Sequence, residues 1–142
     1  MNSKNYLIYD ADCGFCQRSV NIMKKITADK IDFVANYEIE DGFYGIEKNS
    51  LNSSIKFFEH CSNEITAVKK YKYHEIFPDA IVYHGAYAIF KALNVNWFFK
   101  PLLFCYHYLP LFALVCESVY KVIAQNRAKI SKAIGADSCK IK

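Results

Sequence analysis

The sequence predicts an α/β fold in which a central mixed sheet of about four strands is flanked by helices and followed by extra C-terminal helices. Apolar runs at 6–9 and 31–35 enclose a segment of helical periodicity, and runs rich in strand formers follow at 55–58 and 80–83. Two long apolar segments then close the chain. Its 142 residues suit one domain, so 1–142 is expected to form a single one.

The first strand, helix and second strand are expected to form one strand-helix-strand unit. The run 6–9 ends at Asp10, and from Cys13 to about Thr27 the apolar residues recur at helical spacing. The run 31–35 then has strand character again. Strands joined by a helical crossover normally lie parallel, so these two are predicted to be parallel neighbours.

The middle of the chain predicts an antiparallel pair with a long connection. Segment 36–52 is punctuated by glycine and should be mostly loop, with one short helix at most. The runs 55–58 and 80–83 should pair antiparallel. Their connection, 60–78, is long for a hairpin and looks like an insertion, so 68–76 is expected to extend the ribbon beyond the sheet.

The C-terminal third predicts three helices. Gly85 opens the first, over 86–93, and segments 97–108 and 111–131 are each long enough for another. Pro110 suits the first turn of the last helix. Residues from about 95 to 131 are therefore expected to form a helical extension packed on the sheet.

Residues 101–116 carry no formal charge, which raises the question of a membrane span. A span needs about 20 apolar residues. Here His107 and the helix-breaking Pro110 interrupt the run, and Lys100 and Glu117 close it. The segment is expected to be a buried helical pair, with contact to a membrane surface or a partner as the alternative.

The net charge of +4 is modest, and the basic residues are not interleaved with aromatic ones, so no nucleic-acid partner is expected. The bases are densest near the C-terminus, where 132–142 is expected to be a solvated basic tail. Contact of this tail with an acidic partner or anionic lipid is the alternative.

The six cysteines are interpreted from the compartment that the N-terminus indicates. The N-terminus lacks the apolar region of a secretory signal, which favours a cytoplasmic protein. Six cysteines with irregular spacing are then thiols, metal ligands or a catalytic pair rather than a disulfide framework. Only Cys13 and Cys16 are closely spaced, while Cys105 and Cys116 lie in apolar segments and are expected to be buried.

Cys13 and Cys16 stand where the first strand passes into the first helix. Amide groups and the helix dipole favour negative charge there, so the Cys13 thiol should ionise readily. Cys16 lies almost one turn further on and is aligned with Val20 and Met23, which turns it toward the core. Cys13 is therefore predicted to be the nucleophile and Cys16 the resolving thiol of thiol-disulfide exchange, without an organic cofactor.

Two carboxylates beside the pair could support it. Asp12 could be a structural N-cap, or it could tune the Cys13 thiolate through repulsion. Asp10, at the end of the strand, could form a turn or accept the proton of Cys16.

Two other functions remain open. In one, the pair is incidental and the domain is a redox-inactive module that binds a protein or a membrane surface. In the other, Cys13 and Cys16 are half of a zinc site. The sequence contains no second Cys-x-x-Cys, so a zinc site would have to recruit Cys61, His60 or Cys139 from far along the chain.

Asp10, Cys13 and Cys16 match the pattern Asp-x-x-Cys-x-x-Cys, and the chain resembles the DCC family of predicted thiol-disulfide oxidoreductases. The resemblance continues through 85–90 and 120–127 to Gly135 and Cys139. It implies a thioredoxin-like fold, Cys13 and Cys16 as the redox pair, and a structural or site-proximal role for Arg127. It also implies a protein or small-molecule disulfide as substrate and an electron donor as second partner.

Two departures from that pattern are visible. Ala11 stands where the family usually has glycine, which is expected to stiffen the loop before Cys13. Thioredoxin relatives usually place a cis-proline opposite the cysteines, where this chain has Ser53 or Ser54. Pro78 also precedes a strand, but it fits the inserted connection better.

Overall fold

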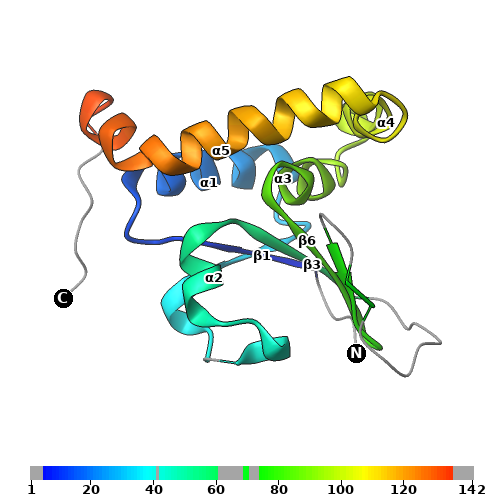
Figure 1. The fold of residues 1–142 in the computed structure, drawn as a ribbon, viewed down its shortest axis with the longest axis horizontal. Helices are drawn as coiled ribbons and strands as arrows, with labels where there is room; N and C mark the ends of the chain where they lie inside the picture. Colours follow the sequence, from blue (N-terminus) through cyan, green and yellow to red (C-terminus); the bar gives the residue numbers. More distant parts are fainter. Residues whose placement is uncertain (1–4, 41, 61–68, 71–73, 136–142) are drawn as a thin grey trace.

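The computed structural model describes residues 5–40, 42–60, 69–70 and 74–135 (Figure 1). The strands are β1 (Tyr6–Tyr9), β2 (Asp32–Ala35), β3 (Lys56–His60), β4 (Lys69–Lys70), β5 (His74–Ile76) and β6 (Ala80–His84). The α-helices are α1 (Gly14–Thr27), α2 (Lys48–Ser53), α3 (Gly85–Leu93), α4 (Lys100–Tyr108) and α5 (Pro110–Ala133). Three short 3₁₀ turns are η1 (Asn36–Glu38), η2 (Phe43–Gly45) and η3 (Trp97–Phe99).

The sheet is mixed and has the strand order β2-β1-β3-β6-β5-β4. β1 pairs parallel with β2, and β3 pairs antiparallel with both β1 and β6, which confirms the predicted pairings. Two short strands, β5 and β4, extend the sheet beyond β6 because the connection 60–78 folds back along this edge. Residues 61–68 and 71–73 of this connection lie outside the described part of the chain.

The sheet divides the core into two parts because neighbouring residues of a strand point to opposite faces. Leu7 and Phe57 lie in one cluster, on the side of α1 and α3. Ile8 and Phe58, the next residues of the same strands, lie in the other cluster with Leu51 of α2. In Figure 1, α2 lies on one side of the sheet and α1 and α3 on the other.

Helix α1 begins at Gly14, one residue later than predicted, and ends at Thr27 as predicted. Its apolar face buries Cys16, Val20 and Met23. At its C-terminus Ala28 adopts a left-handed conformation (φ 48°) and its N–H bonds to the carbonyl of Lys24. The amphipathic periodicity and this cap fix the helix in the register that places Cys13 and Cys16 at its start.

Helices α4 and α5 form an outer layer across α1 and α3 (Figure 1). The prediction that this pair is buried is wrong: Tyr106, Glu117 and Ser131 are the only buried residues of these two helices. Cys105 and Cys116, predicted to be buried, are only half-buried. The pair contacts the protein along one side only, so its other side faces outward.

The inward face of α5 carries polar side chains at helical spacing. The Tyr120 hydroxyl accepts a hydrogen bond from the backbone N–H of Ile55 (2.9 Å), and a Glu117 oxygen accepts one from Tyr87 N–H (3.2 Å). The outward face of α5 carries the apolar residues Leu111, Leu114, Val115, Val119 and Val122, each more than half exposed. Polar side chains therefore share the inward face of this helix with partly buried apolar residues such as Phe112 and Ile123, while other apolar residues are exposed on its outer face.

Among the described residues, no helix alone has the length and apolar composition needed to cross a membrane. The segment Trp97–Tyr108 and the helix Pro110–Ala133, bent by 105° relative to each other, meet that requirement only when taken together.

Candidate active site at the start of helix α1

The two cysteines meet at the first turn of α1, as predicted. Cys13 is the N-cap residue, and its sulfur accepts a hydrogen bond from the backbone N–H of Cys16 (3.2 Å). The Cys16 thiol donates to the same sulfur, with 2.6 Å between the two Sγ atoms. Both cysteines are free thiols and both are 7% exposed. The pair is therefore within bonding reach and largely shielded from water.

The two thiols have opposite acidities. The pKa of Cys13 is lowered to about 6, chiefly because the Cys16 thiol donates a hydrogen bond to the Cys13 sulfur. Burial opposes this shift, whereas the Cys16 N–H, Ser131 and Arg127 also lower the pKa. The same thiol–thiolate hydrogen bond, together with burial, raises the pKa of Cys16. Near neutral pH, Cys13 is thus the thiolate and Cys16 holds the proton.

A spectroscopic titration measures this asymmetry. Ultraviolet thiolate absorbance of the reduced protein is expected to rise with a midpoint near pH 6, because the thiolate fraction of Cys13 grows as the pH passes its pKa. Cys16→Ala removes the donating thiol and is expected to move the midpoint upward. A midpoint at the ordinary cysteine value of about 8.5 in the unsubstituted protein would contradict the assigned acidities.

Asp12 is not the N-cap, so that interpretation of it is wrong. The helix begins at Gly14, and Cys13 occupies the cap position, where its sulfur accepts from the N–H of Cys16. Asp12 is exposed, and its own N–H donates to the Asp10 carboxylate (3.0 Å). An electrostatic effect of Asp12 on the thiolate stays a prediction.

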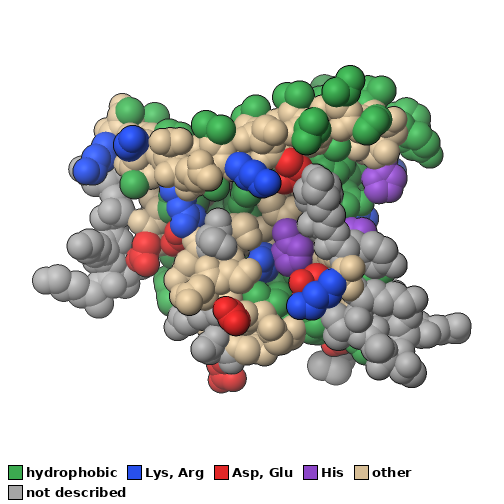
Figure 2. All heavy atoms as spheres, viewed as in Figure 1, with side chains coloured by type: hydrophobic (Ala, Val, Ile, Leu, Met, Phe, Trp, Pro, Cys, Tyr) green, Lys and Arg blue, Asp and Glu red, His purple; other side chains and the backbone are tan. Residues whose placement is uncertain are grey.

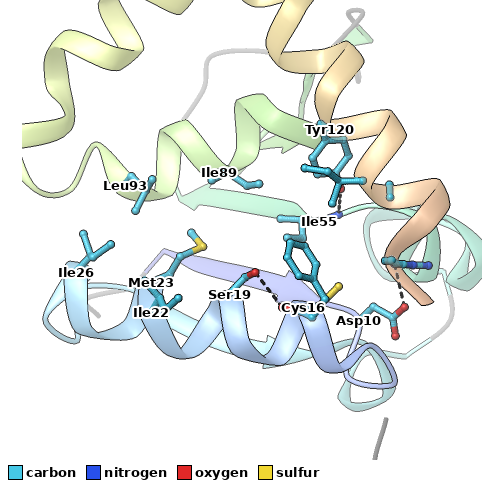
Figure 3. Close-up of a pocket in the computed structure, with 14 residues that line it drawn as sticks. Asp10, Cys16, Ser19, Ile22, Met23, Ile26, Ile55, Ile89, Leu93 and Tyr120 are labelled. Atoms are coloured by element: carbon cyan, nitrogen blue, oxygen red, sulfur yellow. Dashed lines mark hydrogen bonds and ion pairs between the residues drawn. The ribbon is translucent and has the colours of Figure 1, made fainter. Parts of the chain in front are cut away.

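Asp10 is the turn former at the end of β1. Its Oδ1 accepts from the N–H of Asp12, and its Oδ2 lies 3.0 Å from a guanidinium nitrogen of Arg127. Asp10 and Cys16 line the same cavity (Figure 3). The role of Asp10 as proton acceptor for Cys16 stays a prediction. Arg127, which also donates to the carbonyl of Asn52, lies beside the site as the family resemblance implies.

Residues far along the chain hold the loop that carries Cys13. Ser131 of α5 accepts from the backbone N–H of Phe15 (3.0 Å), across 116 positions of sequence. Asn36 Oδ1 accepts from Ala11 N–H (3.2 Å), and its Nδ2 donates to Asn52 (2.6 Å). No local sequence pattern marks Ser131, Asn36 or Asn52, so their roles could not be predicted from the sequence.

The departures at Ala11 and Ser54 are accommodated locally. Ala11 is buried and is not among the residues with positive φ, so its Cβ carries no left-handed strain. Its carbonyl accepts from the side chain of Gln17. Ser54 is extended (φ −151°, ψ 148°) just before β3, and Pro78 lies between β5 and β6. No cis peptide bond occurs in the described ranges.

The described residues contain no group of three or more His, Cys, Asp and Glu side chains that could hold a metal ion. Cys61 and Cys139, the distant candidates for a zinc site, lie outside those residues. His60, the third candidate, lies against Tyr6, with ring centroids 5.5 Å apart and the rings tilted by 48°. His84 faces Lys56 (3.0 Å), and burial lowers the pKa of His84 to about 4.

Comparison with known proteins agrees with this geometry. The family model described as DCC1-like thiol-disulfide oxidoreductase matches residues 7–133, which is most of the chain. This match confirms the predicted family resemblance and thioredoxin-like fold. No curated protein and no solved structure matches the chain.

Proposed function

The chain belongs to the DCC1-like thiol-disulfide oxidoreductase family, and from this premise we propose that it exchanges its Cys13–Cys16 dithiol for a substrate disulfide. One observation carries the proposal. The Cys13 sulfur accepts hydrogen bonds from both the N–H and the thiol of Cys16 at the start of α1, an arrangement that stabilises a thiolate.

The exchange proceeds in two displacements. The Cys13 thiolate attacks one sulfur of the substrate disulfide, the substrate S–S bond breaks, and the other sulfur leaves as a thiolate. Cys16 then loses its proton, for which Asp10 is the nearby carboxylate, and its sulfur attacks Cys13. The second substrate thiolate leaves, so that the substrate gains two electrons and a Cys13–Cys16 disulfide remains.

A second partner must reduce that disulfide again. A dithiol donor would run the same two displacements in reverse and restore the Cys13 thiolate and Cys16 thiol. In a reducing cytoplasm, the compartment we propose, the cycle would run toward reduction of the substrate.

Thiol counting tests the proposal. The protein is reduced, freed of reductant and mixed with excess hydroxyethyl disulfide, and accessible thiols are counted before and after. We expect reversible loss of two thiols per chain, with peptide mapping that links Cys13 to Cys16. Loss of thiols elsewhere, or no loss, would contradict it. Cys116→Ser is the control, since Cys116 lies outside the pair.

The exposed apolar side chains on helix α5 favour a second function, contact with an anionic membrane surface. Exposed apolar side chains cover the outer side of α4 and α5 (Figure 2). Several of them are aromatic, as is typical at the membrane interface: Trp97, Phe98, Phe104 and Tyr108, each at least 60% exposed.

The charges of the same segment complement an anionic surface. Glu117 is the only acidic residue in 97–133, and it is buried and bonded inward. Four lysines of the segment are exposed: Lys100, Lys121, Lys129 and Lys132. An outward face that is apolar, rimmed by lysines and lacking an exposed carboxylate suits anionic lipid, and residues 132–135 of the predicted basic tail continue it. Residues 136–142 lie outside the described part of the chain.

Vesicle sedimentation tests this second function. The protein is expected to bind vesicles of equal parts phosphatidylcholine and phosphatidylglycerol more strongly than phosphatidylcholine alone, and less strongly at high salt. The double variant Leu111→Asp, Leu114→Asp should lower the bound fraction at least about tenfold, because it places two charges on the apolar face. Tyr37→Asp, at an exposed aromatic residue outside that face, is the matched control. Equal binding by all variants, or a lipid-independent dimer through this face, would contradict membrane contact.

A further inference from the structure

An apolar cavity of about 340 Å³ opens beside Cys16, between α1, α3 and α5. In Figure 3, Cys16 and Asp10 lie at one end of the cavity and Ile26 and Leu93 at the other. Between these ends the walls are aliphatic, with side chains from all three helices: Ile22, Met23, Ile89, Ile123 and Ala124. Cys16, the thiol proposed to resolve the mixed disulfide, thus lies at the polar end of a cavity that is otherwise apolar.

The other polar side chains of the wall already have protein partners. Ser19 donates to the carbonyl of Phe15 (2.9 Å), and the Tyr120 hydroxyl accepts from Ile55 N–H (2.9 Å). Arg127 and Asp10 pair with each other. A peptide main chain entering the cavity would exchange its hydrogen bonds to water for contacts with aliphatic carbon, and each polar group left unsatisfied would oppose binding. An alkyl or aryl group entering it would instead gain by leaving water.

From this cavity we infer the substrate class. The substrate is a low-molecular-weight disulfide whose apolar group fills the cavity while its two sulfur atoms lie at the Cys16 end. The inference rests on the proposed exchange and deepens it. The volume lies within the range of about 300–1,000 Å³ that is usual for small-molecule sites. The cavity also shares Ile89, Tyr120 and Ile123 with a shallower apolar groove between α3 and α5 that includes Val115 and Val119 of the outward face. The groove and the cavity therefore adjoin each other.

The position of the cavity beside Cys16 implies the order in which the disulfide bonds form and break. The Cys13 thiolate bonds to the substrate sulfur that carries the apolar group, and the outer sulfur leaves as a thiolate with the electron pair of the broken S–S bond. The apolar group stays in the cavity as part of the mixed disulfide. Cys16, 2.6 Å from the Cys13 sulfur, then loses its proton to water, and its sulfur displaces the apolar group as a thiolate. The two released thiolates take up protons from water. One disulfide is reduced to two thiols and one protein disulfide forms.

Single-turnover kinetics test the inference without any added reductant. Pre-reduced protein is mixed with hydroxyethyl disulfide or with its butyl hydroxyethyl analogue, and each rate is divided by the rate of the same disulfide with a free small thiol. We expect the normalised rate to be at least about tenfold higher for the butyl analogue than for hydroxyethyl disulfide. Within a series of alkyl hydroxyethyl disulfides, it should rise from the ethyl to the butyl compound.

A matched pair of variants links the preference to the cavity. Ala124→Phe places a ring in the cavity and is expected to remove the preference for the butyl analogue. Ala128→Phe makes the same change one turn later on α5, at an exposed residue, and should keep the preference. Equal normalised rates, or a preference that survives Ala124→Phe, would overturn the substrate class alone. Failure of both disulfides to react would overturn the proposed function and this inference with it.

Discussion

Cys13→Ser is expected to lower the rate of disulfide reduction at least about a thousandfold, because it removes the thiolate that starts the exchange. A serine hydroxyl stays protonated at neutral pH even with the hydrogen bonds that the Cys13 sulfur receives from Cys16. Stopped-flow measurement of product thiol, with pre-reduced protein and hydroxyethyl disulfide, gives the rate. A variant that keeps more than a tenth of the activity would show that another group is the nucleophile.

Cys16→Ser separates the two displacements. Its first step should still occur, because Cys13 remains, but the mixed disulfide should persist and be visible by mass spectrometry as an adduct on Cys13. An adduct on any other cysteine would assign the roles differently. Cys105→Ser is the control, since Cys105 lies in α4, outside the pair.

Glu117→Ala is expected to lower the free energy of unfolding by about 2–4 kcal/mol. The buried Glu117 carboxylate accepts from the Tyr106 hydroxyl (2.6 Å) and from Tyr87 N–H (3.2 Å), so it joins α5 to both α4 and α3. Alanine would leave these two buried donors without their acceptor. Urea unfolding followed by circular dichroism measures the change.

The matched control is Glu117→Gln, which keeps one acceptor oxygen and should cost less than the alanine variant. Space at this position is tight: a Cβ on Gly85, which has φ +65°, would lie 2.8 Å from Glu117 Oε2. Because α5 also carries Arg127 and Ser131, loosening it in Glu117→Ala should raise the pKa of Cys13. Equal unfolding midpoints for the unsubstituted protein and both variants would show that the carboxylate does not hold the helices together.

Sequence patterns predicted the parts of the fold that local periodicity determines. The four main strands and α1 follow from alternating or helical spacing of apolar residues, and the Cys13–Cys16 pair follows from its place between the first strand and α1. The two added strands, β4 and β5, come from the connection 60–78, where only the long gap between strands indicated extra structure.

The orientation of α5 could not be predicted from apolarity alone. Periodicity places apolar residues on one side of a helix and assumes that this side faces the core. In α5 the inward side also carries Glu117, Tyr120, Arg127 and Ser131, while apolar residues such as Leu111 and Val119 are exposed. The spacing of these four residues was a usable signal, but their partners are backbone N–H groups and a carboxylate distant in sequence, which become neighbours only in the folded chain.

The N-cap shows a similar limit of local rules. Aspartate is a preferred cap, which favoured Asp12, yet the helix starts one residue later and Cys13 caps it with sulfur. Helix boundaries are uncertain by a residue or two from sequence, and here one residue decides which atom receives the free amide.

Equilibration in glutathione redox buffers followed by peptide mapping measures whether Cys13 and Cys16 form a reversible redox couple. We expect a single two-electron transition in which a peptide containing a Cys13–Cys16 disulfide appears as the buffer becomes more oxidising and disappears when it is reduced again. A protein that shows no Cys13–Cys16 linkage at any buffer ratio, while its fold persists, would show that the pair is not redox-active.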